Sequence, residues 1–176
     1  SSVVYNIHVY KYVSLIPLSL LFLPRIFINT DFVTFTEKIK NKEYIFNYIK
    51  SYMSLFFLIS ILICGFSFFF SKEILSIFSQ DFAVYSESFL ILIFGISGIL
   101  IFRGLFGNLL SSIGKIEINS YIMAIALVLN IFSNFYLIPI YGIKGAEITS
   151  ALLMWFTGIF SCIWFLYLYK KTSINE

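Results

Sequence analysis

The sequence predicts an all-α membrane protein, and three observations support that class. Hydrophobic residues make up 60% of the 176 residues, charged residues only 12%, and the mean hydropathy is +0.94, whereas a soluble domain has about 25% charged residues. The apolar residues fall in stretches long enough to cross a bilayer core, which takes about 20 residues in helical form. Because lipid cannot satisfy backbone polar groups, continuously apolar stretches of this length are expected to be helices.

Five such stretches are separated by polar connections. We expect spanning helices over about residues 3–23, 53–70, 89–110, 121–138 and 143–169. The connection after the first stretch carries apolar residues at near-helical spacing between charged ones, namely Phe35, Ile39, Phe46 and Ile49. This pattern predicts a cytoplasmic amphipathic helix over about 31–51 that runs into the second span. The alternative is a solvated linker.

The positive charges of the connections predict the orientation of the chain. Eight Lys and Arg residues lie in or beside 25–51, 111–119 and 170–176, whereas two lie in 71–88 and 139–147. Lys and Arg are retained on the cytoplasmic side of membrane proteins. The first three segments, and with them the C-terminus, are therefore expected to be cytoplasmic.

Composition also argues against several classes of function. The net charge of +3 is small and scattered, which does not suggest nucleic acid binding. His8 is the single histidine, and neither Cys64 nor Cys162 has His or Cys neighbours at metal-ligand spacing. We therefore expect no metal site, no cofactor and no catalytic residues. The chain begins at Ser1 inside an apolar segment with no signal-peptide pattern, which predicts a fragment that lacks an N-terminal part.

Lys11 is an ionisable residue near the middle of the first span. Tyr5, His8, Ser14 and Ser19 share its helical face. Charged side chains inside a membrane usually point into a bundle or a water-filled cavity, so this face favours a cavity that holds an anion. The alternative is a Lys side chain that extends to the outer interface.

Arg103 lies about one turn from the centre of the third span. Gly104, Gly107 and Ser111 share its side of the helix. A guanidinium offers a planar fork of donors that matches phosphate, which makes Arg103 a second candidate for anion binding. A structural pairing with a helix end or a carboxylate is the alternative, and both interpretations stay open.

The fourth span carries three polar residues, two amides and one hydroxyl, on one side of the helix. Asn130, Ser133 and Asn134 occupy positions i, i+3 and i+4. Such residues form hydrogen bonds between membrane helices or line a cavity. Inter-helix bonding is the favoured interpretation, with cavity lining as the alternative.

The fifth span carries a stripe of small residues and one carboxylate. The stripe consists of Ala146, Ser150, Thr157 and Ser161, and small residues let membrane helices pack closely. We expect Glu147 to be solvated at the outer mouth, with a coupling-ion role as the alternative.

A tight outer turn is expected over residues 137–145, between antiparallel fourth and fifth spans. Pro139 lacks a backbone N–H and disfavours a continued helix before it. Gly142 and Gly145 permit turn dihedrals and close packing.

The segment around this turn resembles a known family. Residues 130–134 (NIFSN) and 137–146 (LIPIYGIKGA) resemble the signature of the bacterial polysaccharide flippases. These are the O-antigen and capsule repeat-unit transporters of the multidrug/oligosaccharidyl-lipid/polysaccharide exporter superfamily. Residues 104–115 (GLFGNLLSSIGK) resemble the preceding small-residue helix of that family, which ends in a Gly-Lys turn. The sequence departs from the pattern at Ser79, where Gly is common, and at Glu147, where a second Ala is usual.

The resemblance implies a transporter of two similar helical lobes, with this chain as most of the C-terminal lobe and the N-terminal lobe missing. It implies a multi-pass protein of the bacterial cytoplasmic (inner) membrane that flips undecaprenyl-diphosphate-linked oligosaccharide for O-antigen, lipopolysaccharide or other surface polysaccharide biosynthesis. Its partners are then the lipid-linked oligosaccharide, membrane lipids and the missing lobe, and no nucleic acid. The candidate substrate-binding residues are Lys11, His8, Arg103, Asn130 and Asn134.

Several other functions are weighed against this one. Within the superfamily, the alternatives are a peptidoglycan-precursor flippase and a multidrug antiporter. The spans carry no pair of carboxylates, which disfavours the drug branch. A membrane enzyme of the polysaccharide pathway is expected to cluster Asp, Glu, His or Arg in its outer loops, and 71–88 and 139–147 carry no such cluster. The polar faces of the spans argue weakly against a membrane scaffold.

Overall fold

A computed structural model describes residues 13–172 of the chain, and the regular elements of this part are all helical. Residues 13–19 form a first helical segment. The elements after it are α2 (Phe22–Lys38), α3 (Lys42–Ser76), the 3₁₀-helix η1 (Gln80–Tyr85), α4 (Ser86–Gly98), the π-helix η2 (Ile99–Arg103), α5 (Gly104–Ser112), α6 (Ile116–Tyr141) and α7 (Ile143–Thr172).

The predicted all-α membrane class is confirmed. Four helical segments of the described residues are long and apolar enough to cross a membrane: Lys42–Ser76, Gln80–Ser112, Ile116–Tyr141 and Ile143–Lys171. The first expected span, residues 3–23, lies partly outside the described residues. Within them, the apolar stretch Val13–Ile26 is too short to count as a span.

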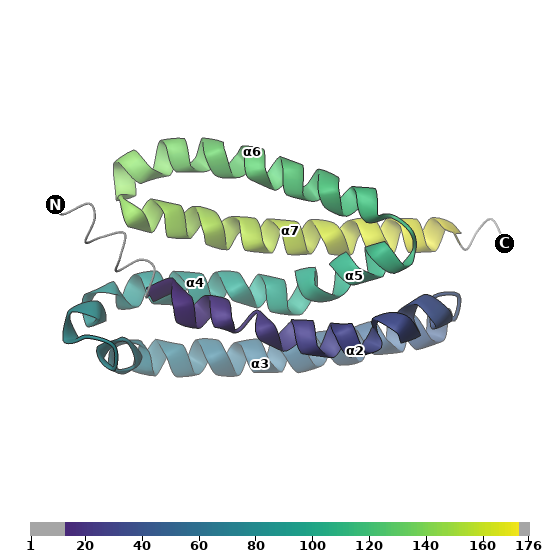
Figure 1. The fold of residues 1–176 in the computed structure, drawn as a ribbon, viewed down its shortest axis with the longest axis horizontal. Helices are drawn as coiled ribbons and strands as arrows, with labels where there is room; N and C mark the ends of the chain where they lie inside the picture. The colour runs from purple at the N-terminus through teal and green to yellow at the C-terminus, as the bar shows by residue number, and fades with distance from the viewer. Residues whose placement is uncertain (1–12, 173–176) are drawn as a thin grey trace.

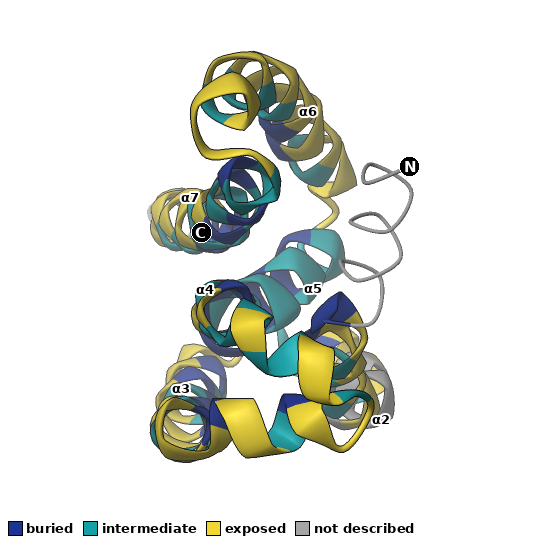
Figure 2. Cartoon of the chain, turned by 90° about the vertical axis from the view of Figure 1, so that its left-hand side faces the viewer, coloured by how far each residue is buried: buried dark blue, intermediate teal, exposed yellow. Residues whose placement is uncertain are grey.

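The helices are stacked one above another (Figures 1 and 2). α6 lies at one side, α7 comes next, a middle layer of α4, η2 and α5 follows, and α2 and α3 lie at the other side. α7 packs against α6 on one side and against the middle layer on the other. The segment Gln80–Ser112, which contains the middle layer, is the most buried of the four apolar segments. Its Leu100 and Phe106 lie in one hydrophobic core with Phe56 of α3 and Phe165 of α7.

The first described helix is broken at Leu20 and Leu21, and Pro24 explains the break. Pro24 has no N–H to donate to the carbonyl of Leu20, and its ring would clash with that carbonyl in a continuous helix. At the third position of α2, by contrast, the missing N–H costs nothing. Arg25 therefore lies in the first turn of α2, and not in a connection after the first span.

The amphipathic connection expected over 31–51 takes a different form in the structure. α2 continues to Lys38, and only residues 39–41 separate it from α3, whose N-terminus is capped by Asn41 accepting the Tyr44 N–H at 3.0 Å. The apolar spacing therefore belongs to two helices that face each other across a sharp turn. Phe35 of α2 is fully buried with its ring 4.6 Å from that of Tyr48, measured between centroids.

α4 and α7 approach closely through small residues. A Cβ added to Gly95 would lie 2.7 Å from the Ala151 Cα atom, and one added to Gly158 would lie 2.8 Å from the Gly98 carbonyl oxygen. Neither distance is tolerable for a methyl group, so glycine is required at both positions. The closest approach of α7 thus runs through Ala151 and Gly158, beside the expected stripe, of which Thr157 and Ser161 are buried as well.

The turn between α6 and α7 is shorter than the turn predicted over residues 137–145. α6 runs through Pro139 to Tyr141, and Gly142 alone, with a φ of 61° and a ψ of −138°, reverses the chain. This positive φ is accessible to glycine and strained for other residues. A Cβ on Gly145 would overlap the Leu137 carbonyl, so Gly145 allows α7 to start directly against the end of α6.

The expected solvation of Glu147 at the outer mouth is wrong, since only 1% of its surface is accessible. α7 starts directly against the end of α6, and the start of α4 packs beside this turn of α7, where Glu87 pairs with Lys144.

Candidate functional site

A π turn in the middle layer sets the position of Arg103. The Gly104 N–H donates to the Ile99 carbonyl five residues earlier, which adds one residue to that turn of helix. Such turns shift the angular position of everything that follows and occur often at functional sites. The Tyr52 hydroxyl of α3 donates to the Leu100 carbonyl at 3.2 Å and so satisfies a backbone group within the turn.

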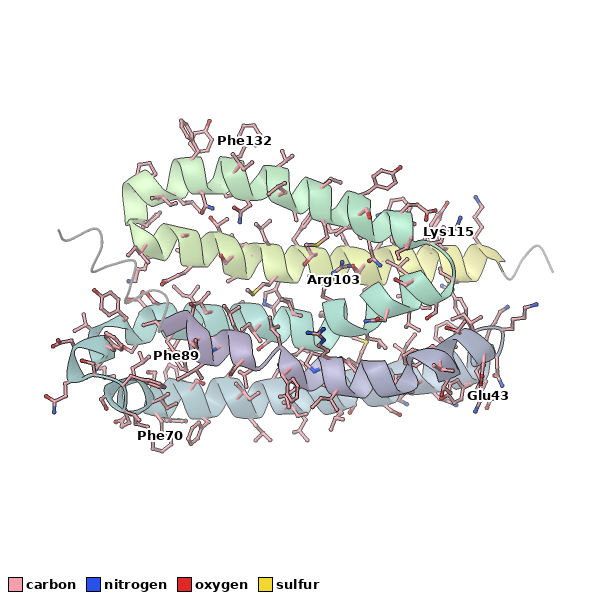
Figure 3. All side chains as sticks on the ribbon, in the orientation of Figure 1. Glu43, Phe70, Phe89, Arg103, Lys115 and Phe132 are labelled. Carbon is pink, nitrogen blue, oxygen red and sulfur yellow. The ribbon has the colours of Figure 1, made fainter. Side chains whose placement is uncertain are left out.

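The Arg103 guanidinium is held by two neutral acceptors on other helices. Its Nη1 donates to Asn119 Oδ1 of α6 at 2.7 Å and to Ser161 Oγ of α7 at 2.6 Å. Figure 3 shows Arg103 reaching from the middle layer toward α7. Asn119 is itself fixed, since its Nδ2 donates to the Gly107 carbonyl at 2.7 Å and to Ser111 Oγ at 3.3 Å.

Gly107 makes room for this arrangement. A Cβ at residue 107 would lie 3.3 Å from Nη1 of Arg103 and 3.7 Å from Oδ1 of Asn119. The small side of α5 predicted from Gly104, Gly107 and Ser111 is therefore the surface on which the guanidinium rests. This surface of α5 thus accommodates the Arg103 side chain and also allows the helices to pack closely.

The positive charge of Arg103 is not matched by a carboxylate among the described residues. The two ion pairs of this part of the chain join Lys115 to Glu117 and Lys144 to Glu87. Arg103 lies in the Gln80–Ser112 segment, about 16 Å along the helix from the Gly114 turn at a rise of about 1.5 Å per residue. That depth is near the middle of a bilayer core about 30 Å thick, where an uncompensated charge is costly.

Arg103 lines a groove of about 490 Å³ between η2, α6 and α7. Its polar lining consists of Arg103, Asn130, Ser150 and Thr157. The rest of the lining is aliphatic or thioether: Ile99, Met123, Ala126, Leu127, Leu153 and Met154. A groove of this kind offers one cation and a few neutral hydrogen-bonding groups on an apolar wall.

The side chains of the two asparagines of α6 are hydrogen-bonded to each other. Asn134 Nδ2 donates to Asn130 Oδ1 at 2.9 Å, within the same helix, so this pair is not bonded across helices as the favoured sequence interpretation had it. The Asn134 Oδ1 atom is buried without a hydrogen-bond partner. Asn130 faces the groove, which agrees with the alternative of cavity lining.

The structure thus brings together Arg103, Asn130 and, through Asn130, Asn134. Lys11 and His8 lie outside the described residues. Sequence reasoning missed Asn119, because the fourth span was expected to begin at residue 121, whereas α6 begins at Ile116. It also assigned Ser161 to helix packing, although the polar spacing of Ser150, Thr157 and Ser161 could have indicated a face for a polar partner.

Comparison with known proteins identifies the family. The sequence model of the MatE family matches residues 39–136, a segment that runs from the α2–α3 turn through most of α6 and includes Arg103, Asn119 and Asn130. No curated protein and no solved structure matched the chain. MatE proteins are transporters and not enzymes. Since the match covers more than half of the 176 residues, this chain of apolar helices belongs to the MatE family of membrane exporters.

Proposed function

We propose that this MatE protein exports a lipid-linked oligosaccharide by flipping its undecaprenyl-diphosphate carrier from the cytoplasmic to the outer leaflet, for surface polysaccharide biosynthesis. The observation that carries the proposal is the guanidinium at mid-membrane depth, held by Asn119 and Ser161 without a carboxylate partner among the described residues. An anion that enters the groove gains a charge-assisted hydrogen bond and removes an uncompensated charge.

The same observation disfavours organic cations as the cargo. A cationic drug in this groove would meet Arg103 at close range in surroundings of low dielectric, where repulsion between like charges is strong. A peptidoglycan precursor also carries a diphosphate on a polyprenyl lipid, so the groove chemistry suits it equally. The resemblance of residues 130–146 to the polysaccharide flippases favours the oligosaccharide.

The test compares binding of undecaprenyl diphosphate with binding of undecaprenol, which lacks phosphate. Arg103→Gln should weaken binding of the diphosphate about 10- to 150-fold, since a hydrogen bond to a charged group contributes about 1.5–3 kcal/mol. Binding of undecaprenol should not change. Lys115→Gln, which removes an exposed cation at the end of the same helical segment, is the matched control and should bind both lipids as the wild type does.

Two further variants extend the test to function in cells. In cells, Arg103→Gln and Lys11→Ala should each reduce surface polysaccharide at an unchanged level of protein in the membrane, and Lys11→Arg should retain part of the export because the charge is kept. Equal affinity of wild type and Arg103→Gln for the diphosphate lipid would remove Arg103 from the site. Normal export by Lys11→Ala would leave Lys11 as an interface residue.

A further inference from the structure

The π turn of the middle layer deprives one backbone carbonyl of its ordinary donor. In a regular α-helix, the Gly104 N–H would donate to the carbonyl of Leu100, four residues earlier. In the π turn it donates to the Ile99 carbonyl instead. Leu100 is only 1% exposed, and a buried carbonyl without a hydrogen-bond partner is strongly disfavoured. The turn is therefore stable here only with a donor from outside its own helix.

Tyr52 of α3 supplies that donor. Its hydroxyl donates to the Leu100 carbonyl at 3.2 Å. The Tyr52 side chain is 4% exposed, and its ring is stacked on that of Phe56, with 4.3 Å between the centroids and 28° between the planes. The ring of Tyr48, one turn earlier on α3, is stacked at 6.3 Å. This packing fixes the ring of Tyr52 and with it the direction of the hydroxyl.

α7 supplies space for the turn and no side-chain donor. A Cβ added to Gly158 would lie 2.8 Å from the Gly98 carbonyl oxygen and 3.3 Å from the backbone nitrogen of Arg103. A glycine has no side chain that could bond to the turn. The indole N–H of Trp155 donates to the Phe94 carbonyl at 2.9 Å, which lies before the turn. The hydrogen bond to the Leu100 carbonyl thus comes from α3.

The π turn determines where Arg103 points. Each residue of a regular α-helix advances the side chains by about 100° around the axis. If the Gly104 N–H returned to the Leu100 carbonyl, the wide turn would close and the angular position of Arg103 would change. Its hydrogen bonds to Asn119 on α6 and to Ser161 on α7, which are 2.7 and 2.6 Å long, would then be lost.

We propose that Tyr52 is a positioning residue for the Arg103 site. Its hydroxyl holds the π turn open from the side of α3, and Arg103 points into the groove as a consequence. Tyr52 does not line the groove, so it acts through the backbone of the middle layer and not by contact with a ligand. Its effect on ligand binding rests on the proposed function, whereas its effect on the direction of Arg103 does not.

Nuclear magnetic resonance of isotope-labelled arginine side chains tests the proposal without any lipid. The chain has two arginines, Arg25 and Arg103, so the signals that disappear in Arg103→Gln belong to Arg103. In the wild type these should be separate and slowly exchanging, because Nη1 is bonded to two acceptors. The exposed Arg25 should give averaged signals. In Tyr52→Phe, the Arg103 signals should become averaged like those of Arg25.

Tyr169→Phe is the matched control. Tyr169 is also a buried tyrosine, 7% exposed, whose hydroxyl donates to a main-chain carbonyl, that of Ile39 at 2.6 Å. Its ring is likewise stacked on a phenylalanine, Phe165. This variant loses the same kind of hydrogen bond away from the π turn, so the Arg103 signals should stay as in the wild type. Unchanged Arg103 signals in Tyr52→Phe would overturn the proposal and leave Tyr52 as a packing residue.

Lipid binding extends the test to the groove. Tyr52→Phe should weaken binding of undecaprenyl diphosphate within the range expected for Arg103→Gln, about 10- to 150-fold, and leave binding of undecaprenol unchanged. In the Arg103→Gln background it should add no further loss, because Tyr52 acts through the arginine. A full additional loss in the double variant would contradict the proposal. If Arg103→Gln alone does not alter lipid binding, the proposed function fails, and the arginine signals still decide the role of Tyr52.

Discussion

At the scale of single residues, the site depends on a cation that is positioned without being neutralised. Arg103 donates hydrogen bonds to the side-chain amide oxygen of Asn119 and to the hydroxyl oxygen of Ser161. Neutral partners fix the direction of the guanidinium and leave its charge available to a ligand, whereas a carboxylate would compete with that ligand. Asn119 in turn is oriented by the Gly107 carbonyl, which determines that its oxygen faces Arg103.

A permanent counter-charge beside Arg103 should therefore weaken binding of the diphosphate lipid. Asn119→Asp places a carboxylate 2.7 Å from the guanidinium, and binding of the diphosphate lipid should fall about as far as in Arg103→Gln, roughly 10- to 150-fold. Asn108→Asp is the matched control, since Asn108 is also half-buried and also donates to a helix carbonyl, that of Gly104. If Asn119→Asp binds the lipid like the wild type, Arg103 does not act through its charge.

At the scale of elements, the middle helix is shaped for contact with α7. Gly95, Gly98 and Gly158 bring the two backbones together, and the π turn Ile99–Arg103 lies immediately beyond this contact. Gly158 approaches both the Gly98 carbonyl and the backbone nitrogen of Arg103. The position of the arginine therefore depends on the distance between these helices.

Gly158→Ala should consequently destabilise the protein. The added methyl group would lie 2.8 Å from the Gly98 oxygen and 3.0 Å from the Phe102 Cβ atom, and overpacking of this kind costs about 1–3 kcal/mol. Gly65→Ala in α3 meets nothing within 4 Å and should be neutral or stabilising by up to about 1 kcal/mol. Unfolding by a denaturing detergent measures both variants, and equal stability of the two would contradict the close-packing account.

At the scale of the whole molecule, the alternation of the helices gathers the positive charges at one end. The α2–α3 turn, the turn after α5 and the end of α7 lie together in Figure 1, opposite the α6–α7 turn and η1. The Tyr169 hydroxyl of α7 donates to the Ile39 carbonyl in the α2–α3 turn at 2.6 Å, which joins two parts of that end. Lys72 and Lys144 are the lysines near the opposite end of the described chain.

The charge distribution predicts which end is cytoplasmic. In a variant whose Cys64 and Cys162 are replaced by alanine, Lys115→Cys should react with an impermeant thiol reagent only from the cytoplasm, and Gln80→Cys only from outside, because Lys and Arg are retained inside. Both positions are exposed in the structure. Labelling of Gln80→Cys from the cytoplasm alone would reverse the topology.

The sequence by itself determined the membrane class, the location of four apolar helices, a reversal of the chain within residues 137–145 and the presence of a cation deep in the third span. These follow from local chemistry: apolar length, the dihedral freedom of glycine and the cost of charge in lipid. The tertiary structure alone decided the partners of Arg103, the groove that it shares with Asn130, the split of residues 31–51 between two helices and the burial of Glu147. Helical periodicity places a side chain on a face, but the neighbour of that face depends on how distant helices pack, and the π turn changes the angular position of Arg103 in a way that no regular period predicts.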